Sequence, residues 1–81
     1  MPYINQHSRD DIDSGVVPVT PGELNYLLTV TILEYVREVG ERYSTFNDVI
    51  GALEACKLEF YRRTVVPYEN TKIEENGDVI I

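Results

Sequence analysis

The sequence contains one cysteine, one histidine and no tryptophan, and these scarcities exclude several kinds of chemistry. A single cysteine cannot form a disulfide within the chain, and we expect it to be a small buried apolar residue. One histidine, with no second ligand at a recognised spacing, does not indicate a metal site, and no cofactor motif is present. No apolar run approaches the roughly 20 residues that a membrane-spanning helix needs. The start, MPYINQHSRDD, lacks the basic and apolar regions of a signal peptide, so we expect a cytoplasmic protein.

Basic residues are also scarce, with seven Lys and Arg against fourteen Asp and Glu and a net charge of −7. This balance argues against binding long nucleic acid or an anionic membrane, because both need a broad cationic face. It is compatible with an acidic surface that a basic host protein would recognise.

The chain is short, at 81 residues, and has no staple to compensate for a small core. Small domains bury a smaller share of their surface than large ones, and self-association often supplies the missing burial. We therefore expect one small domain that forms a homo-oligomer, a dimer or higher.

Residues 1–19 are expected to form an arm, with at most a short helical turn that begins at Ser8. Residues 20–40 are expected to form the first long helix. Thr20 is suited to its N-cap, Pro21 to its first position and Gly40 to its end. Residues spaced by three and four give this helix one apolar face: Leu24, Leu28, Thr31, Ile32, Tyr35 and Val39. Val30 and Leu33 point away from that face, which is either a second contact surface or an isolated exposed pair.

The second long helix is expected over 45–66, with its N-cap at Ser44 or Thr45. Its main stripe, predicted to be core, contains Phe46, Val49, Ile50, Leu53, Cys56 and Phe60. Leu58, Tyr61 and Val65 form a second stripe, rotated by roughly 120–140° at about 100° per residue. A helix with two apolar stripes has two partners, so we assign the second stripe to another copy of the chain. Gly51 and Ala55, small residues four apart, favour close approach, and we expect the oligomer interface to contain Gly51, Ala55, Leu58 and Val65.

Pro67 disfavours helical geometry at the preceding residue, so the second helix is expected to end or kink there. Residues 67–81 fit either a further short helix and a tail or a hairpin around Asn76-Gly77. Lys72, Glu74 and Glu75 are better suited to a helix than to a strand, which favours the first alternative.

The stretch KLEFYRRTVVPYEN, residues 57–70, is the best candidate for a ligand site. Three of the seven basic residues gather there between tyrosines, and we expect the ligand-binding residues to be Lys57, Tyr61, Arg62, Arg63 and Tyr68. Guanidinium groups bind phosphate or carboxylate in a planar fork, and tyrosine rings stack on flat ligands. The alternative is structural, because cations near a helix C-terminus complement its dipole and tyrosines also serve as core residues.

Several segments together resemble a family of short uncharacterised proteins of bacteria and their phages, catalogued as a domain of unknown function. They are PYINQ, GELNYLLT, NDVIGALEACKLEFYRRTVVPYEN and KIEENGDV. The resemblance implies a small helical fold and a phage or prophage setting, and it brings no established activity.

The sequence thus predicts an all-α fold: a small antiparallel helical hairpin with an N-terminal arm and a short C-terminal helix or tail, completed by homo-oligomerisation. We expect a non-enzymatic protein that sequesters a small anionic, nucleotide-like ligand. In the phage setting that the resemblance implies, the ligand would be a host defence signal. The alternative is an acidic protein-interaction module or an inhibitor of a host protein.

Overall fold

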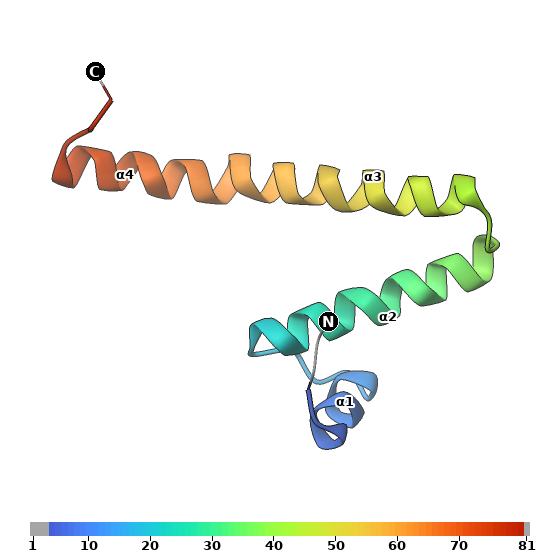
Figure 1. The fold of residues 1–81 in the computed structure, drawn as a ribbon. Helices are drawn as coiled ribbons and strands as arrows, with labels where there is room; N and C mark the ends of the chain where they lie inside the picture. The colour runs from blue at the N-terminus through green and yellow to red at the C-terminus, as the bar shows by residue number, and fades with distance from the viewer. Residues whose placement is uncertain (1–3, 81) are drawn as a thin grey trace. The chain divides into compact units, whose positions relative to one another are not determined.

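The computed structural model describes residues 4–80 and contains only helices and connecting turns (Figure 1). The elements in chain order are α1 (Gln6–Asp13), α2 (Pro21–Val39), α3 (Tyr43–Phe60), the π-helical segment η1 (Tyr61–Val65) and α4 (Val66–Asn76). The all-α prediction is confirmed. The chain divides into two units, Met1–Phe46 and Asn47–Ile81, which are described separately.

In unit 1 the N-terminal segment is more structured than the sequence predicted. Its helix α1 begins at Gln6, before Ser8, because the side chain of Asn5 accepts a hydrogen bond of 2.8 Å from the Ser8 N–H. Asparagine is among the strongest N-cap residues, and this cap was missed. Ile4 lies against Gly22, whose missing side chain leaves room for it, so Ile4 docks on α2. Tyr3 lies outside the described residues.

Helix α2 has the ends that its sequence predicts. Thr20 accepts a hydrogen bond of 3.1 Å from the Glu23 N–H, and Pro21 occupies the first turn. The carboxylate of Glu23 accepts in return from the Val19 N–H at 2.9 Å, so the reciprocal bond lies one residue before the cap. Gly40 ends the helix with a φ of +131°, a conformation that side chains disfavour.

Helix α3 begins two residues earlier than the sequence predicted, at Tyr43. Its first turn is closed by the Phe46 N–H, which donates to the Arg42 carbonyl at 3.1 Å. Thr45, expected to be a cap, lies inside the helix and is 3% exposed. The turn before it is fixed by Arg42, whose guanidinium folds over Gly40 and donates to the Val39 carbonyl at 2.9 Å.

Apolar burial in unit 1 occurs on a different face of α2 from the predicted one. Among residues 4–80 the buried apolar side chains are Ile12 and Val36. On the predicted face, Leu24, Leu28, Tyr35 and Val39 are all exposed and Ile32 is half-buried. Tyr26 and Val30 instead lie on the side of α2 that meets the end of α1. Within unit 1 the longest apolar stripe of α2 is therefore not the one that is covered.

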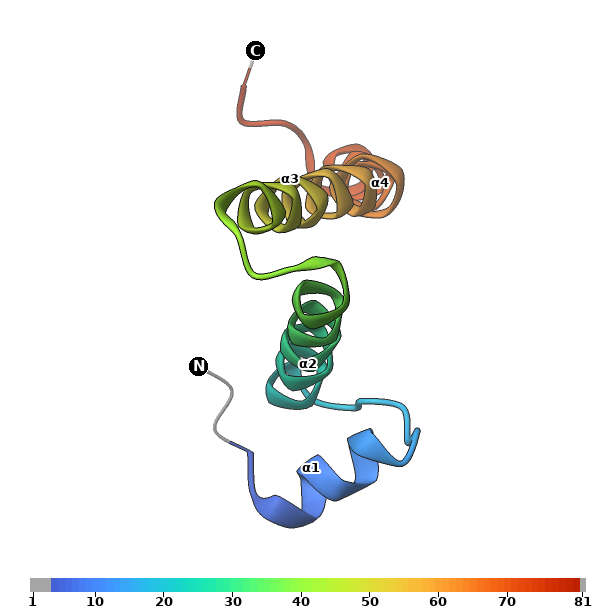
Figure 2. The ribbon, with the colours of Figure 1, turned by 90° about the vertical axis from the view of Figure 1, so that its right-hand side faces the viewer.

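Unit 2 is a single helical rod, in which α3, η1 and α4 follow one another without a break (Figures 1 and 2). The sequence predicted that the second helix ends or kinks near Pro67; the chain remains helical there, and the irregularity is the wide turn of η1 before the proline. Within η1 the turn widens, and the Val66 N–H donates to the Tyr61 carbonyl, five residues back. A proline ring clashes with the carbonyl four residues before it and offers no N–H. The wider turn accommodates Pro67 in the first turn of α4, so the chain remains helical.

The C-terminal segment adopts the helix and not the hairpin. Gly77, with a φ of +85°, ends α4 by donating its N–H to the Ile73 carbonyl at 2.8 Å. The carboxylate of Asp78 accepts from the Ile80 N–H at 2.9 Å, which turns the short tail. Within residues 4–80 there is no strand, so Asn76-Gly77 serves as a helix stop.

Candidate functional site

The predicted ligand residues lie along the rod of unit 2, and two of them share one side of it. A shallow depression of about 530 Å³ lies at the junction of α3 and η1. It is lined by Ala55, Leu58, Glu59, Tyr61, Arg62 and Val66. The lining combines two predicted ligand residues with two predicted interface residues, and most of it is apolar. The predicted ligand residues Tyr61 and Arg62 therefore share one surface with the predicted interface residues Ala55 and Leu58.

The cations near this depression are held by neighbouring carboxylates. Glu59 accepts from Arg62 at 2.8 Å and from Arg63 at 2.5 Å, so a single carboxylate serves both guanidinium groups. Lys57 lies 3.4 Å from Glu54. The side chains of the three cations are between 70% and 75% exposed, and ion pairs in such positions contribute little to stability. They are free to exchange Glu59 or Glu54 for another anion.

The two tyrosines of the predicted site are held differently. The Tyr61 hydroxyl donates to the Glu69 carboxylate at 3.1 Å and so links η1 to α4. This hydrogen bond, the negative charge of Glu69 and partial burial raise the pKa of Tyr61. Lys72 lies over the Tyr68 ring, with its ammonium nitrogen 5.5 Å from the ring centre, in a cation–π contact.

The structure brings together only part of the predicted ligand set. Tyr61 and Arg62 line the same depression, whereas Lys57, Arg63 and Tyr68 do not. At about 100° per residue, Lys57 and Arg62 are roughly 140° apart around the rod, so they are not neighbours. A ligand in the depression would meet one guanidinium and one tyrosine.

The predicted interface residues are all accessible in unit 2. Ala55 and Leu58 line the depression, and a side chain added at Gly51 would meet open space. Val65 is half-buried. Because of the wide turn in η1, Val66 and not Val65 lines the depression beside Leu58. Cys56, predicted to be core, is exposed, as are Phe46, Ile50, Leu53 and Phe60 of the same stripe. Unit 2 consists of the rod alone, so no element within this unit covers the stripe.

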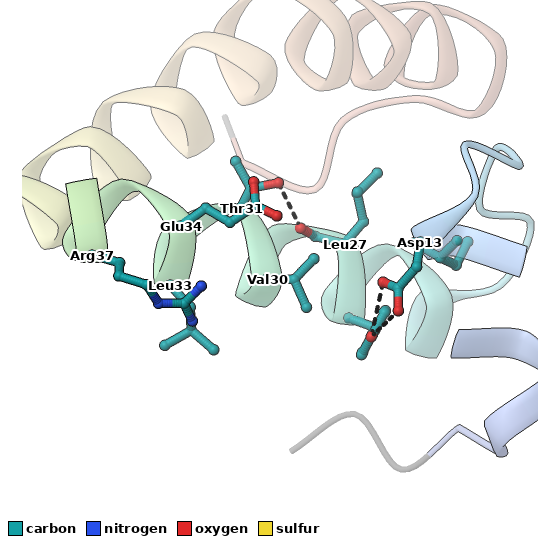
Figure 3. Close-up of a pocket in the computed structure, with 9 residues that line it drawn as sticks. Asp13, Leu27, Val30, Thr31, Leu33, Glu34 and Arg37 are labelled. Atoms are coloured by element: carbon teal, nitrogen blue, oxygen red, sulfur yellow. Dashed lines mark hydrogen bonds between the residues drawn. The ribbon is translucent and has the colours of Figure 1, made fainter. Parts of the chain in front are cut away.

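Unit 1 has a second depression, which the sequence did not predict as a site. It has a volume of about 430 Å³ and lies where the end of α1 meets α2 (Figure 3). The Tyr26 hydroxyl donates to both carboxylate oxygens of Asp13, at 3.0 and 3.1 Å. Val30, Leu33 and Arg37 lie on the same side of α2, as Figure 3 shows.

A sequence signal for this face exists in the spacing of Tyr26, Val30, Leu33 and Arg37, at four, three and four residues. The sequence drew attention to Val30 and Leu33 as residues pointing away from the main face, and both line this depression. Leu33, one turn further along the same face, is 51% exposed. Burial and the hydrogen bond to Asp13 raise the pKa of Tyr26.

The family of the chain can now be stated. A protein-family model with the description "Domain of unknown function (DUF6899)" matches residues 1–79. The chain belongs to the DUF6899 family. This confirms the expected membership of an uncharacterised family, and the matched region of the DUF6899 chain includes all its helices. No curated protein and no solved structure matches it.

Two further findings on the DUF6899 chain concern membranes and metals. No helix within residues 4–80 combines the length and the apolar character needed to cross a membrane. In the same described part of the chain, no three His, Cys, Asp or Glu side chains are grouped as a metal site would require.

Proposed function

We propose that the chain is a non-enzymatic subunit of a small helical homo-oligomer that binds a small anionic, nucleotide-like ligand. In this proposal the two long helices pair as an antiparallel hairpin and further copies cover the remaining apolar stripes. Self-association is supported by the exposure of large apolar side chains in both units, such as Leu24 and Tyr35 in α2 and Ile50 and Phe60 in α3. Contiguous apolar surface of this kind marks interaction sites.

The observation that carries the ligand proposal is the shared depression of Tyr61 and Arg62. Leu58 and Val66 line it with apolar side chains that would suit a flat ring, and Arg62 offers a planar fork for phosphate. Its volume of about 530 Å³ lies in the range of small-molecule sites. A phosphate would take Arg62 from Glu59, while Arg63 would remain with that carboxylate and keep it paired.

The setting of this function comes from the resemblance to phage and bacterial proteins. In a phage, a non-enzymatic protein that binds a nucleotide-like anion would sequester a host defence signal in the host cytoplasm. Capture without turnover needs a tight site and many copies, and a homo-oligomer supplies several sites in one particle.

The test is native mass spectrometry of the purified protein, followed by thermal shift and calorimetric titration with mononucleotides and cyclic dinucleotides. We expect an oligomer with bound nucleotide, or one that binds an added nucleotide. Arg62→Ala should weaken binding by about 10- to 100-fold, since a charge-assisted hydrogen bond contributes roughly 1.5–3 kcal/mol. Arg63→Ala, which removes the same charge outside the depression, is the matched control and should bind nearly normally. Equal affinity in the wild type and Arg62→Ala would contradict the ligand site.

A second candidate function is an acidic protein-interaction module or inhibitor of a host protein. It is favoured by the pairing of Lys57, Arg62 and Arg63 with carboxylates, which leaves a surface dominated by a net charge of −7. This candidate predicts no bound nucleotide and the recovery of one basic host protein in stoichiometric amount. A titration in which no nucleotide binds, together with such a complex, would replace the first candidate by the second.

A further inference from the structure

The wide turn of η1 determines which residues of α3 and α4 share a side of the rod. An α-helix advances about 100° per residue, and a π turn holds one extra residue. Residues eight apart across η1 are therefore oriented like residues seven apart in a regular helix, within about 20° of each other. The hydrogen bond of 3.1 Å between Tyr61 and Glu69, eight residues apart, agrees with this count.

The same count aligns apolar residues from both halves of the rod. Leu58 and Val66 are eight apart, and Leu58 and Ile73 are fifteen apart, which correspond to seven and fourteen in a regular helix. Together with Tyr61 they form one seam: Leu58, Tyr61, Val66 and Ile73. Leu58 is 57% exposed, Tyr61 49% and Ile73 41%, so most of the seam is uncovered within unit 2. A seven-residue apolar repeat is the pattern by which helices pair side by side.

Charge is distributed unevenly along this seam. Residues 57–63 contain Lys57, Arg62 and Arg63 against Glu59, which gives +3 − 1 = +2. Residues 69–75 contain three carboxylates, at positions 69, 74 and 75, against Lys72, which gives +1 − 3 = −2. The rod therefore has a basic segment and an acidic segment on either side of Val66.

We propose that the seam is covered by the seam of a second copy of the chain, packed antiparallel with Val65 and Val66 at the two-fold axis. In this arrangement the basic segment of each copy lies beside the acidic segment of the other. Paired helices are about 8–10 Å apart, a distance comparable to the Debye length at physiological salt, so the segments attract. A parallel pair in register places each segment beside its like and is disfavoured.

The register follows from the position of the axis. Leu58 and Ile73 lie equally far from the midpoint between Val65 and Val66, so Leu58 of one copy packs against Ile73 of the other. The pair rests on the self-association in the proposed function.

Cysteine cross-linking tests the pairing in a Cys56→Ser background, which removes the native thiol. Leu58→Cys and Ile73→Cys are prepared separately and then mixed in equal amounts before treatment with a short bifunctional maleimide. We expect cross-linked dimers in the mixture and few in either variant alone. In the antiparallel pair two Leu58 positions are about 22 Å apart, fifteen residues at 1.5 Å each. Circular dichroism of each variant checks that the helices are retained.

The outcomes separate this inference from the proposed function. Cross-linking of each variant with itself would show a parallel pair and overturn the inference. Oligomers in native mass spectra without any cross-link at these positions would also overturn it, while the proposed function would stand. A monomer at micromolar concentration would contradict the pairing and the self-association together. Nucleotide binding is a separate readout: loss of binding with the Leu58–Ile73 cross-link retained would bear on the ligand site alone.

Discussion

Tyr26 links α1 to α2 through one phenol hydroxyl. Its ring lies in the depression of unit 1, and its hydroxyl donates to both oxygens of Asp13. The pairing joins residues thirteen apart and holds the end of α1 against α2. The sequence did not predict it because Asp13 belongs to an acidic cluster that resembles ordinary solvated surface, and Tyr26 stands outside the longest apolar stripe.

The protonation state of the Tyr26 hydroxyl predicts that the contact between α1 and α2 depends on pH. Burial and the bond to Asp13 raise the pKa of Tyr26 above the value near 10 of an unfolded chain. A group whose folded pKa is raised contributes its full stability below the unfolded pKa and loses it as pH rises through the folded pKa. We therefore expect α1 to detach progressively above about pH 10. Helicity followed by circular dichroism against pH should show this loss in the wild type.

The control for that measurement is a pair of single-atom deletions. Tyr26→Phe should have lower helicity at neutral pH, and its alkaline transition should lack the Tyr26 contribution. Tyr68→Phe removes the hydroxyl from an exposed ring in α4 and should retain the transition. An alkaline transition of the same size in Tyr26→Phe and the wild type would contradict the assignment.

At the scale of elements, local signals predicted helix ends better than helix continuity. Thr20, Pro21, Gly40 and Gly77 act where their cap preferences place them, because the cap bonds involve residues within one turn. The effect of Pro67 depends on whether the preceding turn can widen. The turn does widen, and as a result Val66 replaces Val65 in the depression, which no straight α-helical count from the sequence reveals.

The wide turn predicts that the rod tolerates deletion of one residue in η1 better than insertion of one residue. Deleting Thr64 together with Pro67→Ala should convert η1 into a regular α-helical turn and keep the seam aligned, because the extra residue is the one removed. Inserting one alanine after Thr64 should rotate α4 by about 100° and separate Val66 and Ile73 from Leu58. Loss of two apolar contacts of about 1.5 kcal/mol each should weaken association by about 100-fold.

Analytical ultracentrifugation of the two length variants measures this difference. The deletion variant should associate within a few-fold of the wild type, and the insertion variant should be largely monomeric at the same concentration. Equal association of both variants would mean that the seam does not cross η1.

At the scale of the whole molecule, most of the helical content could be predicted from the sequence and most of the burial could not. Periodicity identifies which residues share a face, but not which face is covered. The α2 face of Leu24 and Leu28 reads as core, yet it is exposed within unit 1, while the face of Tyr26 and Val30 meets α1. Of the predicted ligand residues, Tyr61 and Arg62 line one depression, and the separation of Lys57 and Arg63 from them depends on helix geometry.

The assembly proposed for the rod predicts a charge-swap rescue. By the count across η1, Arg62 and Glu74 flank the seam on the same side. Arg62→Glu and Glu74→Arg should each weaken association by about threefold to tenfold, and the two together in one chain should restore it, because exposed ion pairs contribute roughly 0.2–1 kcal/mol. The single changes move the net charge of −7 in opposite directions, to −9 and −5, so net charge cannot explain a shared loss. Sedimentation equilibrium gives the three association constants.

A double variant that associates as weakly as either single variant would contradict the antiparallel register. In a parallel pair like charges remain opposite like charges after each change, so neither single variant would be expected to weaken association.

The unbroken rod of α3, η1 and α4 also bears on how the chain folds. Its backbone hydrogen bonds join residues four or five apart, so the rod forms without closing any long loop. Helix–coil relaxation of such a segment takes about 0.1–1 μs, whereas the Tyr26–Asp13 contact of unit 1 must first close a loop of thirteen residues. We therefore expect the rod to form and melt rapidly in an isolated chain. Collision with a partner would be the step that fixes it, and the rate of refolding would rise with protein concentration.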